Sequence, residues 1–386
     1  MRRSYLLILA LLLAALPLSG CWSFKTLEHM AYIHALGVDY RDGQYTIYAQ
    51  IANFTNIAKT DVGGQQNENV PVWVGKASGK SFNVAIFNLY DTLQRRLYWS
   101  HLSTLVFTES AAKKGIEEIR DLFQRFGEFR PTFWVFTTNI RLEKLFTAAA
   151  AVDPSPVYSK LGDPIDMNKQ SSFPALPKRM HEFVALFREE SHTLVIPSLK
   201  VDKKSWFDQK KYFEEIVFDG YSVMHRGKWM GMLSSEEARG LLWLNRNLVR
   251  SPLSIRLSEN SVSSVVVKKP TIKIIPIFEQ DQVRFSLHLK LNGHFTQLKG
   301  ISEEDEIRKK VRETIQAQVL RTYRAGLKID ADVLNLSDTV YRKHSKDWKR
   351  LSKNGKLPLD ENSLAEIKVE IKFIHYGKKV HMDAKQ

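Results

Sequence analysis

Residues 101–138, HLSTLVFTESAAKKGIEEIRDLFQRFGEFRPTFWVFTT, contain the pattern that decides the fold class. Residues 101–108 and 131–138 are rich in the β-branched and aromatic residues typical of strands. Between them, apolar residues recur at helical spacing, at Ile116, Ile119, Leu122, Phe123 and Phe126. A strand, a helix and a strand in this order predict a sheet that is packed with helices.

The residues on either side of this stretch continue the same alternation. Residues 31–40 and 44–54 are strand-like, and Asp42-Gly43 between them predicts a hairpin turn. Residues 57–70 are polar and predict a loop, and residues 70–74 predict a short strand. A helix is expected at residues 142–150, and another that buries Phe82, Ala85, Ile86, Leu89 and Leu93.

The middle of the chain begins with a proline-rich connection. Residues 152–177 contain five prolines, and an apolar helical face at Met180, Phe183, Val184 and Phe187 follows. Strands are expected at residues 192–201, 212–225 and 228–233, with a turn at Arg226-Gly227. Ser234 and Glu237 form a capping-box pattern for a helix through residues 241–244.

The last third predicts a long hairpin, two helical stretches and a final strand. Residues 262–278 and 281–295 are strand-like, a helix starts near Ser302, and a second helical stretch covers residues 333–351. The long helix has one apolar side, formed by Ile307, Val311, Ile315, Val319 and Tyr323. Residues 367–373 alternate apolar and charged, which is typical of a strand with one buried face.

The N-terminus predicts an exported lipoprotein. Arg2 and Arg3 precede an apolar run over residues 5–16, which is short for a membrane span. The sequence Leu-Ser-Gly-Cys at residues 18–21 is a lipobox, so we expect cleavage between Gly20 and Cys21. Cys21 would then carry S-diacylglycerol and an N-terminal acyl chain, and hold the chain on the extracytoplasmic face of a membrane.

Together these patterns predict a multidomain α+β protein, with mixed β-sheets packed with helices, after an N-terminal lipoprotein signal peptide. We expect the signal peptide at residues 1–20 and a mixed N-terminal domain at residues 21–190. A middle domain at residues 191–258 and a C-terminal α+β domain at residues 259–386 should follow.

The cysteine count and the net charge exclude some kinds of site and indicate the kind of partner. Cys21 is the only cysteine, so neither an intrachain disulfide nor a thiolate zinc site can form. The formal charge is +15, and residues 259–386 hold 25 lysines and arginines against 17 acids, a net of +8. Because export argues against nucleic acid, this excess indicates anionic lipid headgroups, an acidic partner or a solvated basic face.

Two motifs resemble enzyme signatures but fail in detail. Residues 75–81, GKASGKS, have three residues where a P-loop needs four before its Gly-Lys pair, so we expect a turn and a helix capped by Ser81. Ser110 and Lys113 match S-x-x-K, but no K-T-G occurs, and we expect Ser110 to be a helix N-cap.

Histidines and paired acids add no catalytic pattern. His181-Glu182 lacks a second histidine at zincin spacing, and His29, His34 and His101 are not at ligand spacing on one helix. The adjacent glutamates at 189–190, 214–215 and 236–237 point apart on a helix or a strand. We therefore expect no catalytic residue, no metal and no cofactor, which leaves a binding or assembly role.

Several blocks resemble the Ger(x)C spore germination lipoproteins, the C subunits of nutrient germinant receptors. At the N-terminus these are Gly20-Cys21-Trp22 and Gly37-Val38-Asp39. Further along, residues 79–93, the Leu-Tyr-Trp-Ser-His-Leu motif at 97–102 and residues 115–130 are similar to the family. The central block 219–244 and the helical block 332–348, with Tyr341-Arg342-Lys343 and Lys346-Asp347-Trp348, complete the resemblance.

The resemblance departs from the family pattern at two places. Ser23 stands where the family often has Asp, and residues 220–224 read Gly-Tyr-Ser-Val-Met in place of smaller side chains. The resemblance implies three mixed domains, no catalysis and attachment to the inner membrane of the spore. It also implies two membrane-embedded receptor subunits as partners, which are the expected site of germinant recognition.

Two other functions compete with a receptor subunit. A free-standing extracytoplasmic solute-binding lipoprotein should have two α/β lobes around a ligand cleft. An extracytoplasmic hydrolase should lose its activity when a single polar residue is replaced.

The lipobox generates a prediction about attachment. Cys21→Ala should block lipidation and lipoprotein-type cleavage, because the thiol receives the diacylglycerol. A chain that carries an ordinary cleavable signal and no cysteine should therefore leave the membrane fraction, as measured by fractionation and gel mobility. Full retention of that chain in high salt, with normal function, would show that Cys21 is not the anchor.

Overall fold

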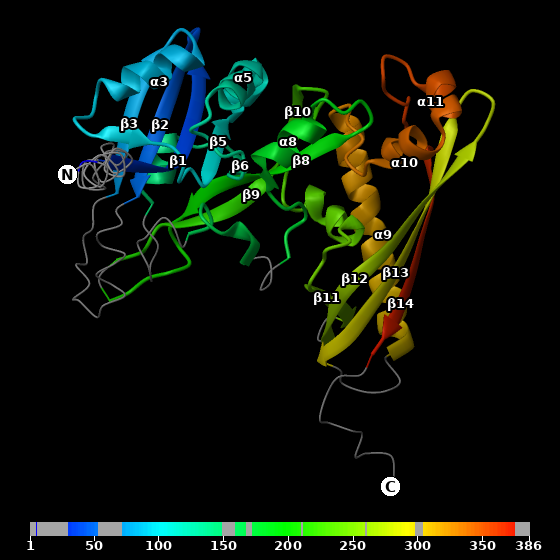
Figure 1. Ribbon diagram of the computed structural model, residues 1–386. Coiled ribbons are helices and arrows are strands. Elements are labelled where there is room, and N and C mark those ends of the chain that lie inside the picture. Colours follow the sequence, from blue (N-terminus) through cyan, green and yellow to red (C-terminus); the bar gives the residue numbers. More distant parts are fainter. Residues whose placement is uncertain are drawn as a thin grey trace.

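The computed structural model describes residue 5 and residues 30–52, 72–148, 159–166, 172–209, 211–258, 261–297 and 304–374. Two sheets organise these residues, and Figure 1 shows the units built on them side by side. The first sheet has the strand order β10-β9-β8-β6-β5-β1-β2-β3, and the second has the order β11-β12-β13-β14. The predicted α+β class, with mixed sheets packed with helices, is confirmed.

The first sheet begins with the predicted hairpin. Strands β1 (Met30–Arg41) and β2 (Gln44–Ala52) pair antiparallel across Asp42-Gly43. Both turn residues have positive φ, 51° and 77°, as this tight two-residue turn requires. On the other side of β2, strand β3 (Trp73–Gly79) extends the sheet.

Parallel strands form the centre of the first sheet. Strands β5 (Thr104–Thr108), β6 (Trp134–Thr138) and β8 (Thr193–Asp202) follow β1 in parallel order. The short strands β4 (Arg96–Tyr98) and β7 (Lys178–Arg179) pair at the margins, with β1 and β6.

Helices cover both faces of this sheet, so its central strands are buried on both sides. One core contains side chains from α3 (Phe82–Tyr90), α4 (Glu109–Lys114), α5 (Glu117–Arg125) and α8 (Met180–Phe187). A smaller core on the other face contains side chains from α6 (Leu142–Phe146) and Leu161.

The segment expected as a middle domain lies mostly in this first sheet. Strands β9 (Glu215–His225) and β10 (Lys228–Leu233) continue from β8 as antiparallel neighbours, with Arg226-Gly227 as the turn. Backbone hydrogen bonding along β8 joins them to β6, so residues 193–233 form no separate sheet. Periodicity marks each strand but carries no information about which sheet it joins.

The second sheet packs on one long helix. Strands β11 (Ser251–Ser258), β12 (Ser261–Phe278) and β13 (Val283–Gln297) run antiparallel. Helix α9 (Glu304–Lys328), then α10 (Leu336–Lys343) and α11 (Ser345–Leu351), lead to β14 (Leu364–Phe373), which pairs in parallel with β13. The predicted apolar side of α9 is confirmed as buried: Ile307, Val311, Ile315, Val319 and Tyr323.

Some local predictions were wrong. Residues 75–79, expected as a turn, belong to β3. Strand β11 was not predicted, although Leu253 and Ile255 alternate with polar residues and are buried. Leu93 lies beyond the end of α3 and Phe126 beyond the end of α5, and both side chains are exposed. The predicted loop at 57–70 lies outside the described residues, as do residues 152–158 and 167–171 of the proline-rich connection.

The 3₁₀ helix η4 (Glu237–Leu244) joins the two sheets by packing closely on α9. The predicted capping box is confirmed, because Ser234 N donates to Glu237 Oε2 at 2.9 Å and Glu237 N donates to Ser234 Oγ at 3.2 Å. A Cβ on Gly240 would lie 2.6 Å from the Gln318 carbonyl oxygen and 2.8 Å from Val319 Cα.

This close approach generates a stability prediction. Gly240→Ala should lower the free energy of unfolding by about 1–3 kcal/mol or more, because the methyl group meets backbone atoms of α9 that cannot rotate away. Gly127→Ala is the matched control, since nothing lies within 4 Å of the position its Cβ would take. Urea unfolding of both variants measures the difference, and equal stability would contradict the packing of η4 on α9.

Candidate functional site

The one site residue predicted from the sequence, Cys21, lies outside the described residues, as does the signal peptide. Within the described ranges, no helix combines the length and apolar character needed to cross a bilayer. No group of three or more His, Cys, Asp or Glu side chains in those ranges is placed to hold a metal ion. The remaining candidate sites are polar clusters and one hollow among the described residues.

The P-loop-like segment is structural. Its first five residues belong to β3 and pair with β2. Ser81 caps α3 as predicted, with Val84 N donating to Ser81 Oγ at 3.2 Å. The close return of α3 explains Gly79, because a Cβ there would lie 2.5 Å from Ala85 N. Lys80 is exposed beside this turn.

Ser110 is not the N-cap that we predicted. Thr108 caps α4, and Ser110 Oγ donates instead to Asp39 Oδ1 at 2.7 Å. Thr108 Oγ1 donates to the same oxygen at 2.6 Å, while Arg41 Nε lies 3.0 Å from Oδ2. Asp39 and Thr108 are buried, and these contacts tie the end of β1 to the start of α4, which gives Asp39 of the Gly-Val-Asp motif a structural role.

Lys113, the other half of the S-x-x-K pattern, is also engaged elsewhere. Its Nζ lies 2.6 Å from Glu109 Oε1 and 4.5 Å from the centre of the Trp229 ring. The adjacent glutamates likewise form separate ion pairs or caps: Glu189 with Arg342, Glu214 with Lys203, Glu236 with Arg321, and Glu237 with the backbone of Ser234.

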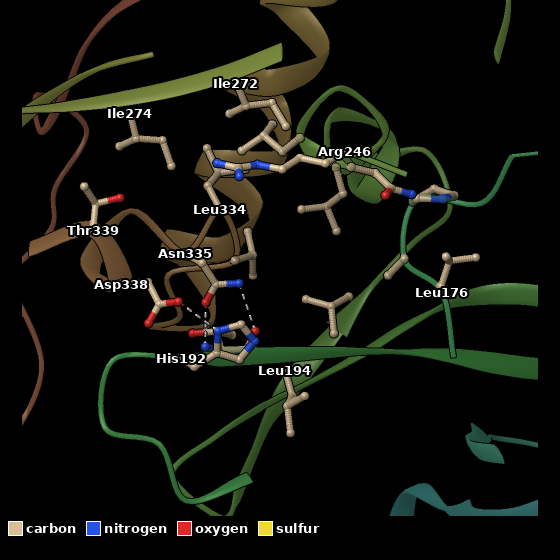
Figure 2. A pocket seen from close by; sticks show the side chains of 18 of the residues that line it. Leu176, His192, Leu194, Arg246, Ile272, Ile274, Leu334, Asn335, Asp338 and Thr339 are labelled. Carbon is tan, nitrogen blue, oxygen red and sulfur yellow. Dashed lines mark hydrogen bonds and ion pairs between the residues drawn. The ribbon is translucent and has the colours of Figure 1, made fainter. Parts of the chain in front are cut away.

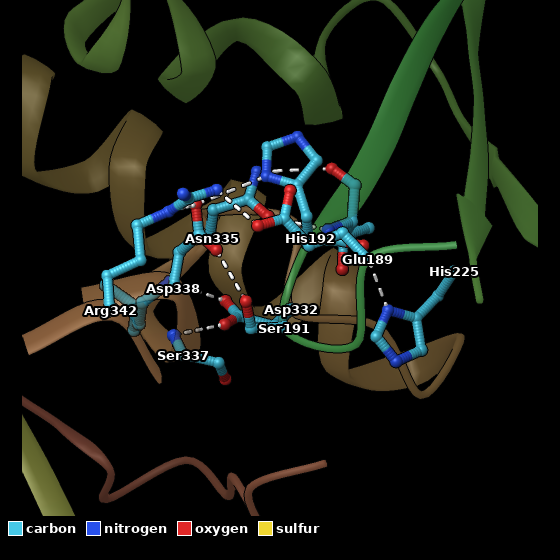
Figure 3. A network of polar contacts seen from close by, with 11 residues as sticks. Glu189, Ser191, His192, His225, Asp332, Asn335, Ser337, Asp338 and Arg342 are labelled. Carbon is cyan, nitrogen blue, oxygen red and sulfur yellow. Dashed lines mark hydrogen bonds and ion pairs between the residues drawn. The ribbon is translucent and has the colours of Figure 1, made fainter. Parts of the chain in front are cut away.

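A polar network lies where the start of β8 meets the loop before α10 (Figure 3). Asn335 has a left-handed backbone, with φ 54° and ψ 40°. Its side chain accepts from Thr193 N at 2.7 Å through Oδ1 and donates to the Thr193 carbonyl at 3.2 Å through Nδ2. One amide group therefore satisfies both backbone groups of Thr193, as a neighbouring strand would.

Asp338 is the centre of the charged part of this network. Ser191 Oγ donates to Asp338 Oδ1 at 2.6 Å, and His192 Nδ1 lies 3.4 Å from Oδ2. Arg342 Nε donates to Oδ2 at 3.3 Å, and its guanidinium also bonds Glu189. Residues about 150 positions apart in the chain, 189–193 and 335–342, are thus joined side chain to side chain.

A second carboxylate, Asp332, holds the start of α10. Its Oδ1 accepts from Leu336 N at 3.1 Å and its Oδ2 from Ser337 N at 2.7 Å. Burial raises the pKa of Asp332, and these backbone donors oppose that rise. Burial also lowers the pKa of His225, whose Nδ1 donates to the His192 carbonyl at 3.2 Å.

Asp338 has the opposite behaviour. Burial on its own would raise the pKa of Asp338, but the hydrogen bonds from His192 and Ser191 and the Arg342 charge lower it to about 2. Asp338 is therefore ionised throughout the neutral range and paired on both oxygens. A carboxylate held in this way stabilises a junction and is a poor proton donor or acceptor.

An open hollow of about 550 Å³ lies beside this network (Figure 2). Its walls come from both units, with apolar side chains that include Leu194, Leu241, Ile272, Ile274, Val333 and Leu334. Lys178, Arg246, Arg342 and Lys343 contribute positive charge, and Arg246 extends towards Leu334 and Ile272. Walls of this composition suit an anionic or amphipathic group better than a cation.

Sequence reasoning did not find this junction. The helical block at 332–348 was recognised, but its partners at 189–193 lie in a stretch of ordinary composition. In the sequence, Asp332, Asn335 and Asp338 indicate only that a helix begins nearby. Nothing in the sequence shows which strand accepts the Asn335 amide.

The fold and the junction define a two-unit α+β protein whose described polar clusters join structural elements. A family described as "Spore germination protein N-terminal domain" matches residues 23–201, and one described as "Spore germination B3/GerAC like, C-terminal" matches residues 219–377. The chain belongs to the Ger(x)C family of spore germination proteins.

Individual proteins agree with this assignment. The chain is 23% identical to spore germination protein KC of Bacillus subtilis (strain 168) over 391 aligned residues, covering 96% of this chain and 95% of that protein. The crystal structure of the GerBC protein matches with a TM-score of 0.53 at 17% identity, covering 89% of this chain and 97% of that one. At this identity the structural match supports the fold.

The junction generates a prediction about pH. Because the pKa of Asp338 falls from 3.8 to about 2 on folding, the stabilisation is present above about pH 4 and is lost as the pH falls towards 2. Asp338→Asn should therefore lower the free energy of unfolding at pH 7 by about 1–2 kcal/mol, and the deficit should shrink in acid.

Asp305→Asn is the matched control, because the Asp305 side chain is fully exposed and lies 3.8 Å from Arg308. Urea unfolding of both variants between pH 2 and pH 7 makes the comparison. A deficit for Asp338→Asn that stays constant with pH would show that lost packing, and not the charge, causes it.

Proposed function

We propose that this chain is the lipid-anchored subunit of a spore nutrient germinant receptor, and that it works beside two membrane-embedded subunits. The observation that carries the proposal is the pair of germination family matches, which together span residues 23–201 and 219–377 in order. The coverage of 96% of this chain by spore germination protein KC supports a whole-chain relationship rather than one shared domain.

Membrane attachment through Cys21 is part of this proposal. The lipobox places the cysteine nine residues before Met30, where β1 begins. A lipid at this position would hold the first sheet close to the bilayer. Two acyl chains or more anchor a protein stably, so this attachment would exceed anything that surface lysines add.

A non-catalytic role fits the side chains that the structure describes. Ser110 and Lys113 have separate partners, Asp338 is held ionised, and Asp332 caps α10. These groups stabilise the contacts between strands, helices and units. The chain would therefore contribute rigid surfaces for assembly, while recognition of the nutrient lies with its partners.

Purification of the assembled receptor tests the proposal. A tagged full chain, expressed at its native level in spores, should recover two multi-spanning membrane proteins in fixed ratio after detergent extraction of the spore inner membrane. Spores without the chain should fail to respond to at least one nutrient that wild-type spores recognise. Recovery of the chain alone, with germination unchanged in its absence, would refute the receptor role.

The hollow between the units is the observation that favours the alternative function, a free-standing solute-binding protein. A free-standing solute binder should take up a small nutrient in the absence of any partner, and the cations around Arg246 favour an anionic one. Calorimetric titration of the isolated full-length chain with a nutrient panel measures this. Tight binding that Arg246→Ala abolishes would favour the alternative over the assembly role.

A further inference from the structure

The hairpin tip between β8 and β9, residues 203–214, projects beyond the first sheet. In Figure 1 the green hairpin extends towards the lower left, away from α9 and the second sheet. Its described residues include three large exposed aromatic side chains, Trp206, Phe207 and Tyr212, with exposed fractions of 57%, 68% and 61%.

Clustering makes this exposure unusual. Among the described residues, seven aromatic side chains are exposed, and three of them lie within this one tip. The other four are dispersed: Tyr5, Trp73, Phe87 and Phe126. Single exposed aromatic residues are common on soluble proteins, whereas several exposed rings gathered at one protruding tip indicate a surface that something else covers.

The described residues of the tip, 203–209 and 211–214, form a hairpin. Phe207 and Tyr212 form an antiparallel bridge, and their ring centres are 5.4 Å apart. Phe213 N donates to the Trp206 carbonyl at 2.9 Å, and Asp208 N donates to the Lys211 carbonyl at 3.0 Å. The backbone therefore holds the rings in a fixed, protruding arrangement.

The acidic groups of the tip are used within it, and basic groups face outwards. Asp202 accepts from Ser205 N at 3.1 Å, and Asp208 accepts from Lys211 N at 2.7 Å. Glu214 pairs with Lys203 at the base of the tip. Lys204 and Lys211, which lie close to these aromatic residues in the chain, are exposed, and Lys211 Nζ lies 5.1 Å from the centre of the Phe213 ring.

This combination matches the chemistry of a lipid surface. Tryptophan and tyrosine favour the headgroup level of a bilayer, where one end of the ring is in apolar surroundings and the other is wet. Lysines beside them can lie along the apolar region and keep their charge among anionic headgroups. Protein–protein interfaces are also rich in aromatic residues, but they are depleted of lysine. The exposed lysines beside the rings therefore favour a lipid surface over a protein partner.

We propose that the 203–214 tip inserts Trp206, Phe207 and Tyr212 into the headgroup region of an anionic bilayer, as a membrane contact separate from Cys21. One insertion at the tip and one lipid at the N-terminus would fix the orientation of the first sheet on the membrane. The proposal goes beyond the receptor role, because it requires neither the lipid nor the partner subunits.

Vesicle binding of the complete mature chain with Cys21→Ser isolates the tip from the lipid anchor. This chain should bind phosphatidylcholine vesicles that contain phosphatidylglycerol more tightly than vesicles of phosphatidylcholine alone. W206S/F207S/Y212S should bind the anionic vesicles at least about tenfold more weakly, since three rings no longer leave water. Lys204→Gln with Lys211→Gln should reduce the preference for anionic vesicles and its sensitivity to salt.

F87S/F126S is the matched control, because it removes two exposed rings elsewhere on the surface and should leave vesicle binding unchanged. Thermal unfolding should show that the three tip substitutions preserve the fold, as expected for exposed side chains. Equal vesicle binding by the Cys21→Ser chain with and without the tip substitutions, or equal weakening by the control, would overturn the proposal.

Tryptophan quenching gives a measurement that does not depend on the stability of the triple variant. Brominated lipids should quench the Cys21→Ser chain more than the same chain with Trp206→Phe, which keeps an apolar ring and removes one fluorophore. No difference in quenching would overturn insertion. Loss of receptor assembly in the triple variant with unchanged vesicle binding would also overturn it, and would identify the tip as a protein contact.

Discussion

The close packing of η4 on α9 is the contact on which the arrangement of the two units depends. Gly240 brings the η4 backbone against α9, and Gly240 N donates to Thr322 Oγ1 at 2.9 Å. Ala238, Leu241 and Trp243 then enter a core that continues from β9 and β10 into the second sheet. Because this core is continuous, the two sheets are not independent bodies joined by a linker.

The polar junction between residues 189–193 and 335–342 fixes the relative orientation of the two units. Burial of apolar surface stabilises many relative orientations of two units, whereas hydrogen bonds tolerate few. Asn335 binds both backbone groups of Thr193, and Asp338 binds Ser191, His192 and Arg342. A junction of this kind holds the two units in a fixed relative orientation. The hollow beside the junction is lined by residues of both units.

The structure explains why the residues that resemble the family are needed for the fold. The Leu-Tyr-Trp-Ser-His-Leu motif places Leu97, Trp99 and Leu102 in the core, with Trp99 Nε1 donating to Tyr90 Oη at 2.7 Å. Gly37 leaves room for Leu142, 2.8 Å from where its Cβ would be, and Asp39 binds Ser110. These motif residues maintain packing, so their presence identifies the fold without identifying a reactive site.

The sequence by itself determined the local elements and the apolar face of each long one. The β1–β2 hairpin, the buried side of α9 and the alternation in β14 follow from turn chemistry and side-chain periodicity, which act over a few residues. The lipobox at Cys21 is likewise a local pattern, and it remains a prediction.

Only the tertiary structure decided which elements share a sheet and which side chains meet. Strands β8 to β10 join the first sheet, which the sequence does not reveal because any strand can form the same backbone hydrogen bonds. Ser110 binds Asp39, which lies 71 positions earlier in the sequence. The junction of residues 189–193 with 335–342 arises in the same way. Contacts between distant residues depend on how whole elements pack, and a local pattern cannot contain that information.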